Sequence, residues 1–118
     1  MYVAWLKDLH MSDLDKVGGK NASLGEMMGA LAEHGVRVPG GFATTAHAYR
    51  EFLAANSLDR RIAERLGRLD PADVQALARC GAEIRGWIAA APFPQKVESD
   101  IRSHYQMLEK DSSSEVSF

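Results

Sequence analysis

The segment with the clearest chemical potential is Gly18-Gly19-Lys20, which stands directly before a run of residues with helical periodicity. Two glycines let a backbone approach a ligand closely and adopt positive φ angles. A helix that begins there would attract an anion through its free N–H groups and its positive dipole end. The ammonium group of Lys20 could add a mobile positive charge against a phosphate. The segment is compatible with a phosphate site, but it lacks the longer P-loop pattern, so an ordinary loop with a solvated lysine stays open as the alternative.

Other polar residues near this loop have simpler explanations. Asp13 and Asp15 could form a paired-carboxylate metal site, but a helical turn capped by Ser12 explains them better. Thr44 and Thr45 could approach a nucleotide, but helix capping accounts for both of them.

The histidines and the single cysteine offer weaker chemistry. The four histidines share no metal-ligand spacing, and we interpret them as surface or partly buried residues: His10, His34, His47 and His104. Cys80 can form no internal disulfide, and its apolar neighbours predict a small buried residue. This cysteine usage is typical of a cytoplasmic protein.

Length and composition favour one compact domain. The chain has 118 residues, 46% of them hydrophobic and 25% charged, with a formal net charge of -2. Basic and acidic residues alternate, which argues against a nucleic-acid binder. No apolar run approaches the roughly 20 residues that a membrane helix needs. The first nine residues lack the pattern of a secretory signal.

Periodicity predicts a mostly helical chain with a few short strands, of class α+β or α/β. Residues 2–6 read as a strand, and apolar spacings of three and four predict a helix over 22–34 with Gly35 as its C-cap. Gly25 and Gly29 share one face of that helix, which either permits close packing or is incidental. Asp70-Pro71 predicts a helix start. The remaining expected elements are helices over 46–55, 58–69, 71–91 and 94–110, a linker over 111–114 and a strand over 115–118.

Three segments carry a resemblance to a known family. They are VGGKNASLGEM at residues 17–27, VPGGFATTA at residues 38–46 and GAEIR at residues 81–85. In order and spacing they resemble the phosphoenolpyruvate synthase (pyruvate, water dikinase) family over essentially the whole chain. The resemblance implies an N-terminal nucleotide-binding domain of ATP-grasp type, of which residues 1–118 would be a part truncated at its C-terminal end.

The family converts ATP, pyruvate and water to AMP, phosphate and phosphoenolpyruvate through a phosphohistidine, with magnesium. The resemblance therefore implies that Lys20 contacts ATP phosphates and that Gly18 and Gly19 form the loop that permits the approach. It also implies a cytoplasmic enzyme of gluconeogenesis that could assemble as a homodimer when complete. The phosphohistidine, the magnesium ligands and the pyruvate site are not expected in this chain, so we expect the fragment alone to be inactive.

Two alternatives stay open. The chain could belong to another dikinase, such as pyruvate, phosphate dikinase or an antibiotic phosphotransferase, because these share the Gly-Gly-Lys opening. It could also be a non-catalytic helical binding module that has kept the shape of the domain.

Overall fold

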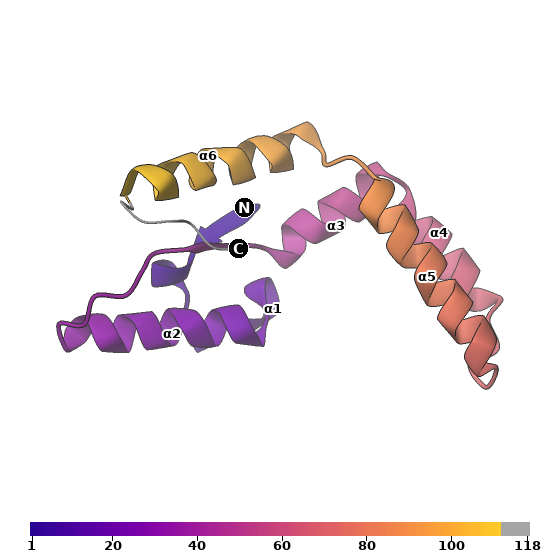
Figure 1. The fold of residues 1–118 in the computed structure, drawn as a ribbon, viewed down its shortest axis with the longest axis horizontal. Coiled ribbons are helices and arrows are strands. Elements are labelled where there is room, and N and C mark those ends of the chain that lie inside the picture. Colours follow the sequence, from indigo (N-terminus) through magenta and orange to yellow (C-terminus); the bar gives the residue numbers. More distant parts are fainter. Residues whose placement is uncertain (112–118) are drawn as a thin grey trace. The chain divides into compact units, whose positions relative to one another are not determined.

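The computed structural model describes residues 1–111 (Figure 1). The chain divides into two compact units: Met1–Tyr49 together with the chain from Gln95 onward, and Arg50–Pro94. The strand expected over 115–118, and the linker before it from residue 112 on, lie outside the described residues.

Within residues 1–111, the first unit contains a small antiparallel sheet of two strands. Strand β1 (Val3–Trp5) confirms the strand expected near the N-terminus, and it pairs with β2 (Phe42–Thr44). Val3 lies opposite Thr44, and Trp5 lies opposite Phe42. Strand β2 was not predicted, because a run of three residues has too little periodicity to reveal a strand before its partner is known.

The chain between the two strands is mostly helical. After β1 come two 3-10 turns, η1 (Leu6–Asp8) and η2 (Met11–Asp13), then the short helix α1 (Leu14–Val17) and the long helix α2 (Gly19–Glu33). Leu9, Val17 and Ala22 form the buried cluster where these elements meet. Helix α2 was expected to begin at Ala22, but it begins at Gly19, three residues earlier.

Gly25 explains how α2 can lie so close to η1. A Cβ atom on Gly25 would stand 2.5 Å from the carbonyl oxygen of Leu9 and 2.7 Å from that of Leu6. Backbone atoms cannot move aside as a flexible side chain can, so only glycine fits there. A Cβ on Gly29 would meet nothing within 4 Å. Close packing therefore explains why residue 25 is glycine, and it does not explain Gly29.

Gly35 ends α2 as expected. Its φ angle is +75°, and its N–H donates to the carbonyl of Ala32 at 3.0 Å. The N–H of Val36 reaches back to the carbonyl of Leu31, also at 3.0 Å. This pair of hydrogen bonds is the Schellman arrangement, which satisfies the last carbonyls of the helix.

Helix α6 (Gln95–Asp111) covers the sheet on the side away from α2, so the sheet lies between the two helices (Figure 1). His104 of α6 contacts both strands: its ring centroid lies 5.0 Å from that of Trp5 and 5.7 Å from that of Phe42. Val97, seven residues before His104 on the same helix, is buried. The helix expected over 94–110 is thereby confirmed to within one residue.

The division between the units falls inside helix α3 (Ala46–Ala55). Thr45 caps its start as expected, because its hydroxyl accepts a hydrogen bond from the N–H of Ala48 at 3.2 Å. The capping role expected for Thr44 is wrong, since Thr44 lies in β2 and pairs with Val3. Its end lies before Asn56 and Ser57, and Ser57 has a φ angle of +54°.

The second unit is built around a helical hairpin. Helices α4 (Leu58–Gly67) and α5 (Val74–Ala90) run side by side (Figure 1). The Arg65 guanidinium donates to the Glu83 carboxylate at 2.8 Å, and the Arg61 guanidinium lies 4.3 Å from the ring centroid of Trp87. The partner's residue number falls from 87 to 83 as that on α4 rises from 61 to 65, so the two helices are antiparallel. Cys80 is buried as expected.

The expected helix start at Asp70-Pro71 is wrong. Helix α5 begins at Val74, and Asp73 is its cap, because the Asp73 carboxylate accepts from the N–H of Ala76 at 3.0 Å. The carboxylate of Asp70 instead accepts from the N–H of Ala72 at 3.0 Å, which closes a turn before the helix. The two aspartates lie three residues apart and both stabilise local turns, so the sequence did not distinguish them.

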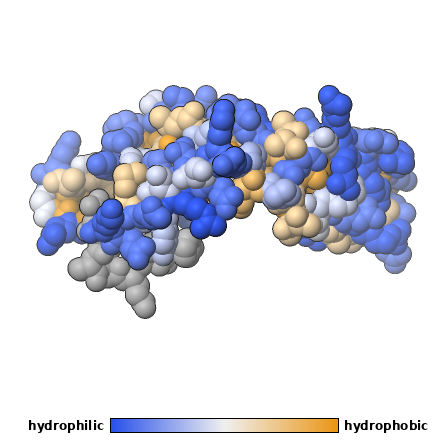
Figure 2. Space-filling model, turned by 90° about the horizontal axis from the view of Figure 1, so that it is seen from above, coloured by the Kyte–Doolittle hydropathy of each residue, from blue (hydrophilic) through white to orange (hydrophobic). Residues whose placement is uncertain are grey.

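On the face shown in Figure 2, hydrophilic side chains dominate and hydrophobic residues appear in smaller areas between them. Among the described residues, no helix is both long enough and apolar enough to cross a bilayer.

Candidate functional site

The candidate phosphate site lies where α1 meets α2, and Gly18 forms the corner. Gly18 has φ +83° and ψ 165°, a backbone conformation that is essentially restricted to glycine. Its N–H donates to the carbonyl of Leu14 at 2.9 Å, and its carbonyl accepts from the N–H of Ala22 at 3.0 Å. One residue thus ends α1 and opens α2.

The side chain of Asn21 holds the same corner from inside α2. Its Nδ2 donates to the carbonyl of Val17 at 2.9 Å. This bond satisfies a carbonyl at the end of α1. This role of Asn21 was not predicted, since a hydrogen bond from an amide to a carbonyl four residues earlier has no distinct sequence signal.

The N-terminus of α2 is open to an anion. Within residues 1–111 no side chain caps it, and its first turn contains no acidic residue. The N–H groups of Gly19, Lys20 and Asn21 precede the first intrahelical bond, which is the one from Ala22 to Gly18. These three donors and the helix dipole favour negative charge at this end.

Lys20 adds a full positive charge to this end of the helix. It is exposed in the first turn of α2 and makes no ion pair with any residue in 1–111. A Cβ on Gly19 would lie 3.6 Å from the nearest atom of Leu14, an ordinary contact. The structure therefore brings together all three predicted residues, Gly18, Gly19 and Lys20, with Lys20 on the helix rather than in a loop before it.

Such an arrangement can bind and neutralise a polyanion. It offers backbone N–H donors in a fixed geometry and one mobile cation. Phosphoryl transfer depends mainly on positioning and on charge neutralisation, which these groups supply.

The Asp13 carboxylate before the loop serves local structure. The carboxylate of Asp13 accepts from the backbone N–H of His10 at 3.0 Å and lies 3.5 Å from the Lys16 ammonium. The hydrogen bond from His10 holds the pKa of Asp13 below its usual value, and Lys16 lowers it further, while partial desolvation opposes both. The expected helical turn is present, but Asp13 supplies the side-chain acceptor and Ser12 does not.

The remaining candidates are spread over the molecule. His10 and His34 are exposed, His47 stacks on Tyr2 with ring centroids 5.2 Å apart, and His104 is partly buried. This distribution agrees with the interpretation of the histidines as surface or partly buried residues. Over residues 1–111, no three histidine, cysteine, aspartate or glutamate side chains gather as a metal site.

The comparison with known families identifies a nucleotide-binding domain family. The chain belongs to the family of the pyruvate phosphate dikinase AMP/ATP-binding domain, which matches residues 14–118. The match includes the whole of the α1–α2 corner.

Individual relatives carry a more specific name. The chain is 54% identical over 111 residues to the phosphoenolpyruvate synthase of Neisseria meningitidis serogroup B, an alignment that covers 94% of this chain and 14% of the relative. It is 53% identical over 107 residues to that of Pseudomonas aeruginosa and 50% identical over 109 residues to that of Escherichia coli K12. These cover 91% and 92% of this chain, and 14% of each relative. The chain thus spans about one seventh of the length of these relatives.

Proposed function

We propose that this chain is the ATP-binding part of a phosphoenolpyruvate synthase, which converts ATP, pyruvate and water to AMP, phosphate and phosphoenolpyruvate. The observation that carries the proposal is the uncapped N-terminus of α2 with Lys20 in its first turn. It lies in a chain that belongs to an AMP/ATP-binding domain family and is 54% identical to a phosphoenolpyruvate synthase.

Each residue of the corner has a distinct part in this proposal. Lys20 neutralises charge on the ATP phosphates, because it is exposed and has no carboxylate partner within residues 1–111. Gly18 directs α2 so that its free N–H groups face the same phosphates, and Gly19 leaves room for their approach. These residues bind and orient ATP, and the phosphohistidine that carries the transferred group belongs to another part of the enzyme.

The finer features of the proposal rest on the family resemblance. They are an ATP-grasp fold for the complete nucleotide-binding domain of which residues 1–118 are a part, pyruvate as the acceptor, Mg²⁺ with the nucleotide, a homodimer, and a cytoplasmic role in gluconeogenesis. Residues 1–111 bring together no set of three candidate ligands for Mg²⁺, and the resemblance implies that these ligands belong to another part of the enzyme.

The test is the Lys20→Ala variant in the complete enzyme, assayed as pyruvate-dependent formation of AMP. A charge-assisted hydrogen bond contributes about 1.5–3 kcal/mol, so kcat/KM for ATP should fall by roughly ten- to a hundredfold. The KM for pyruvate should stay unchanged, since the proposal places pyruvate elsewhere. Lys16→Ala is the matched control, because Lys16 is a neighbouring exposed lysine that pairs with Asp13.

Unchanged kinetics for ATP in Lys20→Ala would refute the role of Lys20. Dependence of the wild-type reaction on added phosphate, rather than on water, would reassign the chain to a pyruvate, phosphate dikinase. Absence of any ATP-dependent reaction in the complete protein would favour the non-catalytic binding module.

A further inference from the structure

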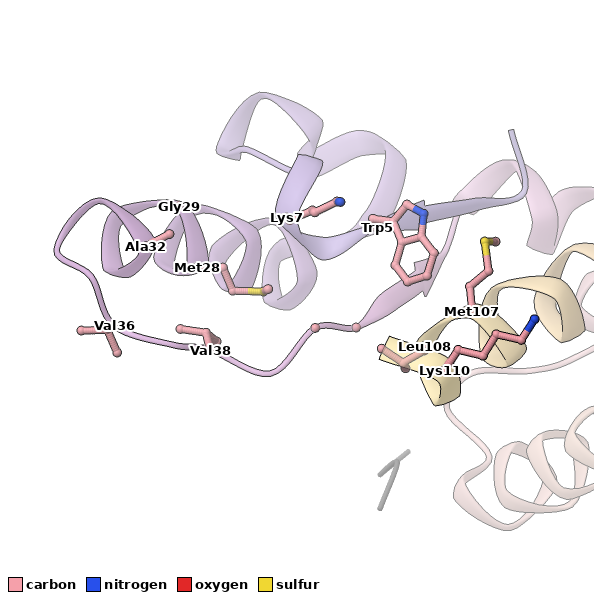
Figure 3. Close-up of a pocket in the computed structure, with 12 residues that line it drawn as sticks. Trp5, Lys7, Met28, Gly29, Ala32, Val36, Val38, Met107, Leu108 and Lys110 are labelled. Carbon is pink, nitrogen blue, oxygen red and sulfur yellow. The ribbon is translucent and has the colours of Figure 1, made fainter. Parts of the chain in front are cut away.

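A pocket of about 680 Å³ opens in the first unit, away from the α1–α2 corner. Figure 3 shows Trp5 of β1 on one side, Met28 of α2 on another, and Leu108 of α6 below them. Its volume lies within the range of small-molecule sites, about 300–1,000 Å³. Four stretches of chain line it, namely residues 5–7, 28–32, 36–41 and 107–110.

The walls of this pocket are held in place independently of any ligand. The Trp5 ring packs edge-on against Phe42, with centroids 5.9 Å apart, and it also contacts His104. The N–H of Leu6 donates to the carbonyl of Gly41 at 2.9 Å, which fixes the segment after β1 to the segment before β2. An aromatic wall that is already immobilised loses little conformational entropy when a ligand binds.

The charged residues of the lining are both positive. Among residues 1–111, Lys7 and Lys110 line the pocket, and no acidic residue does. Within residues 1–111 neither lysine makes an ion pair. A mostly apolar cavity with two unneutralised cations fits a ligand with an apolar body and an anionic group.

Gly29 keeps this space open. A Cβ on Gly29 would meet nothing within 4 Å, and Gly29 lines the pocket. A larger side chain at this position would therefore occupy the pocket.

This pocket is separate from the candidate phosphate site. Gly29 and Lys20 are nine residues apart on α2, which corresponds to about 13 Å along the helix axis and roughly half a turn around it. The two residues therefore lie on opposite faces of α2, and one nucleotide could not easily occupy both places.

We propose that this pocket binds a small amphipathic anion, with a flat apolar body between Trp5 and the Met28–Gly29 stretch of α2 and an acidic group paired with Lys7 or Lys110. The site is independent of the proposed ATP site.

The test uses 8-anilinonaphthalene-1-sulfonate, an aromatic sulfonate whose fluorescence rises in apolar surroundings, titrated into the chain. Gly29→Leu would fill the pocket and should weaken binding of the dye about tenfold or more, since a bulky side chain would then overlap the ligand. Gly86→Leu is the matched control, because Gly86 is also a glycine within a helix with open space around it and lies outside the pocket. It should leave the affinity unchanged.

The charges are tested by Lys7→Gln together with Lys110→Gln, which are surface changes that leave the fold intact. The double variant should bind the dye about tenfold more weakly and lose most of the salt dependence of binding. Lys96→Gln is the control for general loss of positive charge, since Lys96 does not line this pocket.

Three outcomes would overturn the proposal. One is dye binding that Gly29→Leu and the double lysine variant leave unchanged. Another is equal weakening by Gly29→Leu and Gly86→Leu, which would indicate binding to apolar surface in general. The third is displacement of the dye by ATP, which would make the pocket part of the nucleotide site.

Discussion

Gly25 of α2 and Leu9 lie so close together that a Cβ on Gly25 would stand 2.6 Å from the Cβ of Leu9 and 2.5 Å from its carbonyl oxygen. Leu9 is itself part of the buried cluster with Val17 and Ala22. The position of α2, and therefore of the Gly18–Lys20 corner at its start, depends on this approach.

We therefore expect Gly25→Ala to destabilise the chain, although alanine favours helices. Overpacking a tight site typically costs about 1–3 kcal/mol, which outweighs the helix propensity gained. Urea unfolding followed by circular dichroism measures the change.

The matched variant Gly29→Ala lies one helical turn further along the same face and meets open space. It should stabilise the chain by up to about 1 kcal/mol. Equal effects of the two substitutions would contradict the close approach of Leu9 to α2.

Gly18→Ala should destabilise the chain for a different reason. A Cβ on Gly18 would meet nothing within 4 Å, but its φ of +83° and ψ of 165° are a conformation that alanine avoids. Holding a residue in such a region costs about 1–3 kcal/mol. Gly19→Ala is the control, since its Cβ would make an ordinary contact at 3.6 Å, and it should change the unfolding free energy little. A neutral Gly18→Ala would show that the corner does not need this backbone conformation.

Much of the helical framework could be predicted because local chemistry determines it. Gly35 and Thr45 have roles that neighbouring residues alone define, and the structure confirms both. Asp70 and Asp73 show the limit of this approach: each accepts from a nearby N–H, and the local sequence does not distinguish the turn from the helix cap.

Features that depend on distant contacts could not be predicted. Strand β2 exists because it pairs with β1, about 39 residues earlier, as the pair of Ala4 and Ala43 illustrates. The distinct reasons for Gly25 and Gly29 appear only when Leu9 is placed beside α2. The sequence predicted that Gly18, Gly19 and Lys20 act together before a helix. It did not predict that α2 begins at Gly19, because this start is defined by the hydrogen bond from the N–H of Ala22 to the carbonyl of Gly18.

The stability of the chain should depend on pH through Asp13. The hydrogen bond from His10 holds the folded-state pKa of Asp13 below its unfolded value, so the contribution is present above roughly pH 4 and is lost as pH falls through the folded pKa. The difference in unfolding free energy between wild type and Asp13→Asn should therefore shrink on acidification from pH 6 to pH 3. A difference that stays constant over this range would show that Asp13 does not act through its charge.

Thr45 should be needed for its hydroxyl group and not for its shape. The hydroxyl donates to the carbonyl of Met1 at 2.8 Å and accepts from the N–H of Ala48 at 3.2 Å, and the residue is buried. Thr45→Val keeps the volume but leaves both backbone groups unpaired, at a cost of about 1–3 kcal/mol. Thr45→Ser restores the hydroxyl and should recover most of this loss in urea unfolding.

The control for Thr45 is its neighbour. Thr44 is exposed on β2 opposite Val3, so Thr44→Val suits a strand and should change the unfolding free energy by less than about 0.5 kcal/mol. If Thr45→Val were as harmless as Thr44→Val, the hydroxyl bonds that join the N-terminal residue to the start of α3 would contribute nothing to stability. The capping role of Thr45 would then be limited to its backbone conformation.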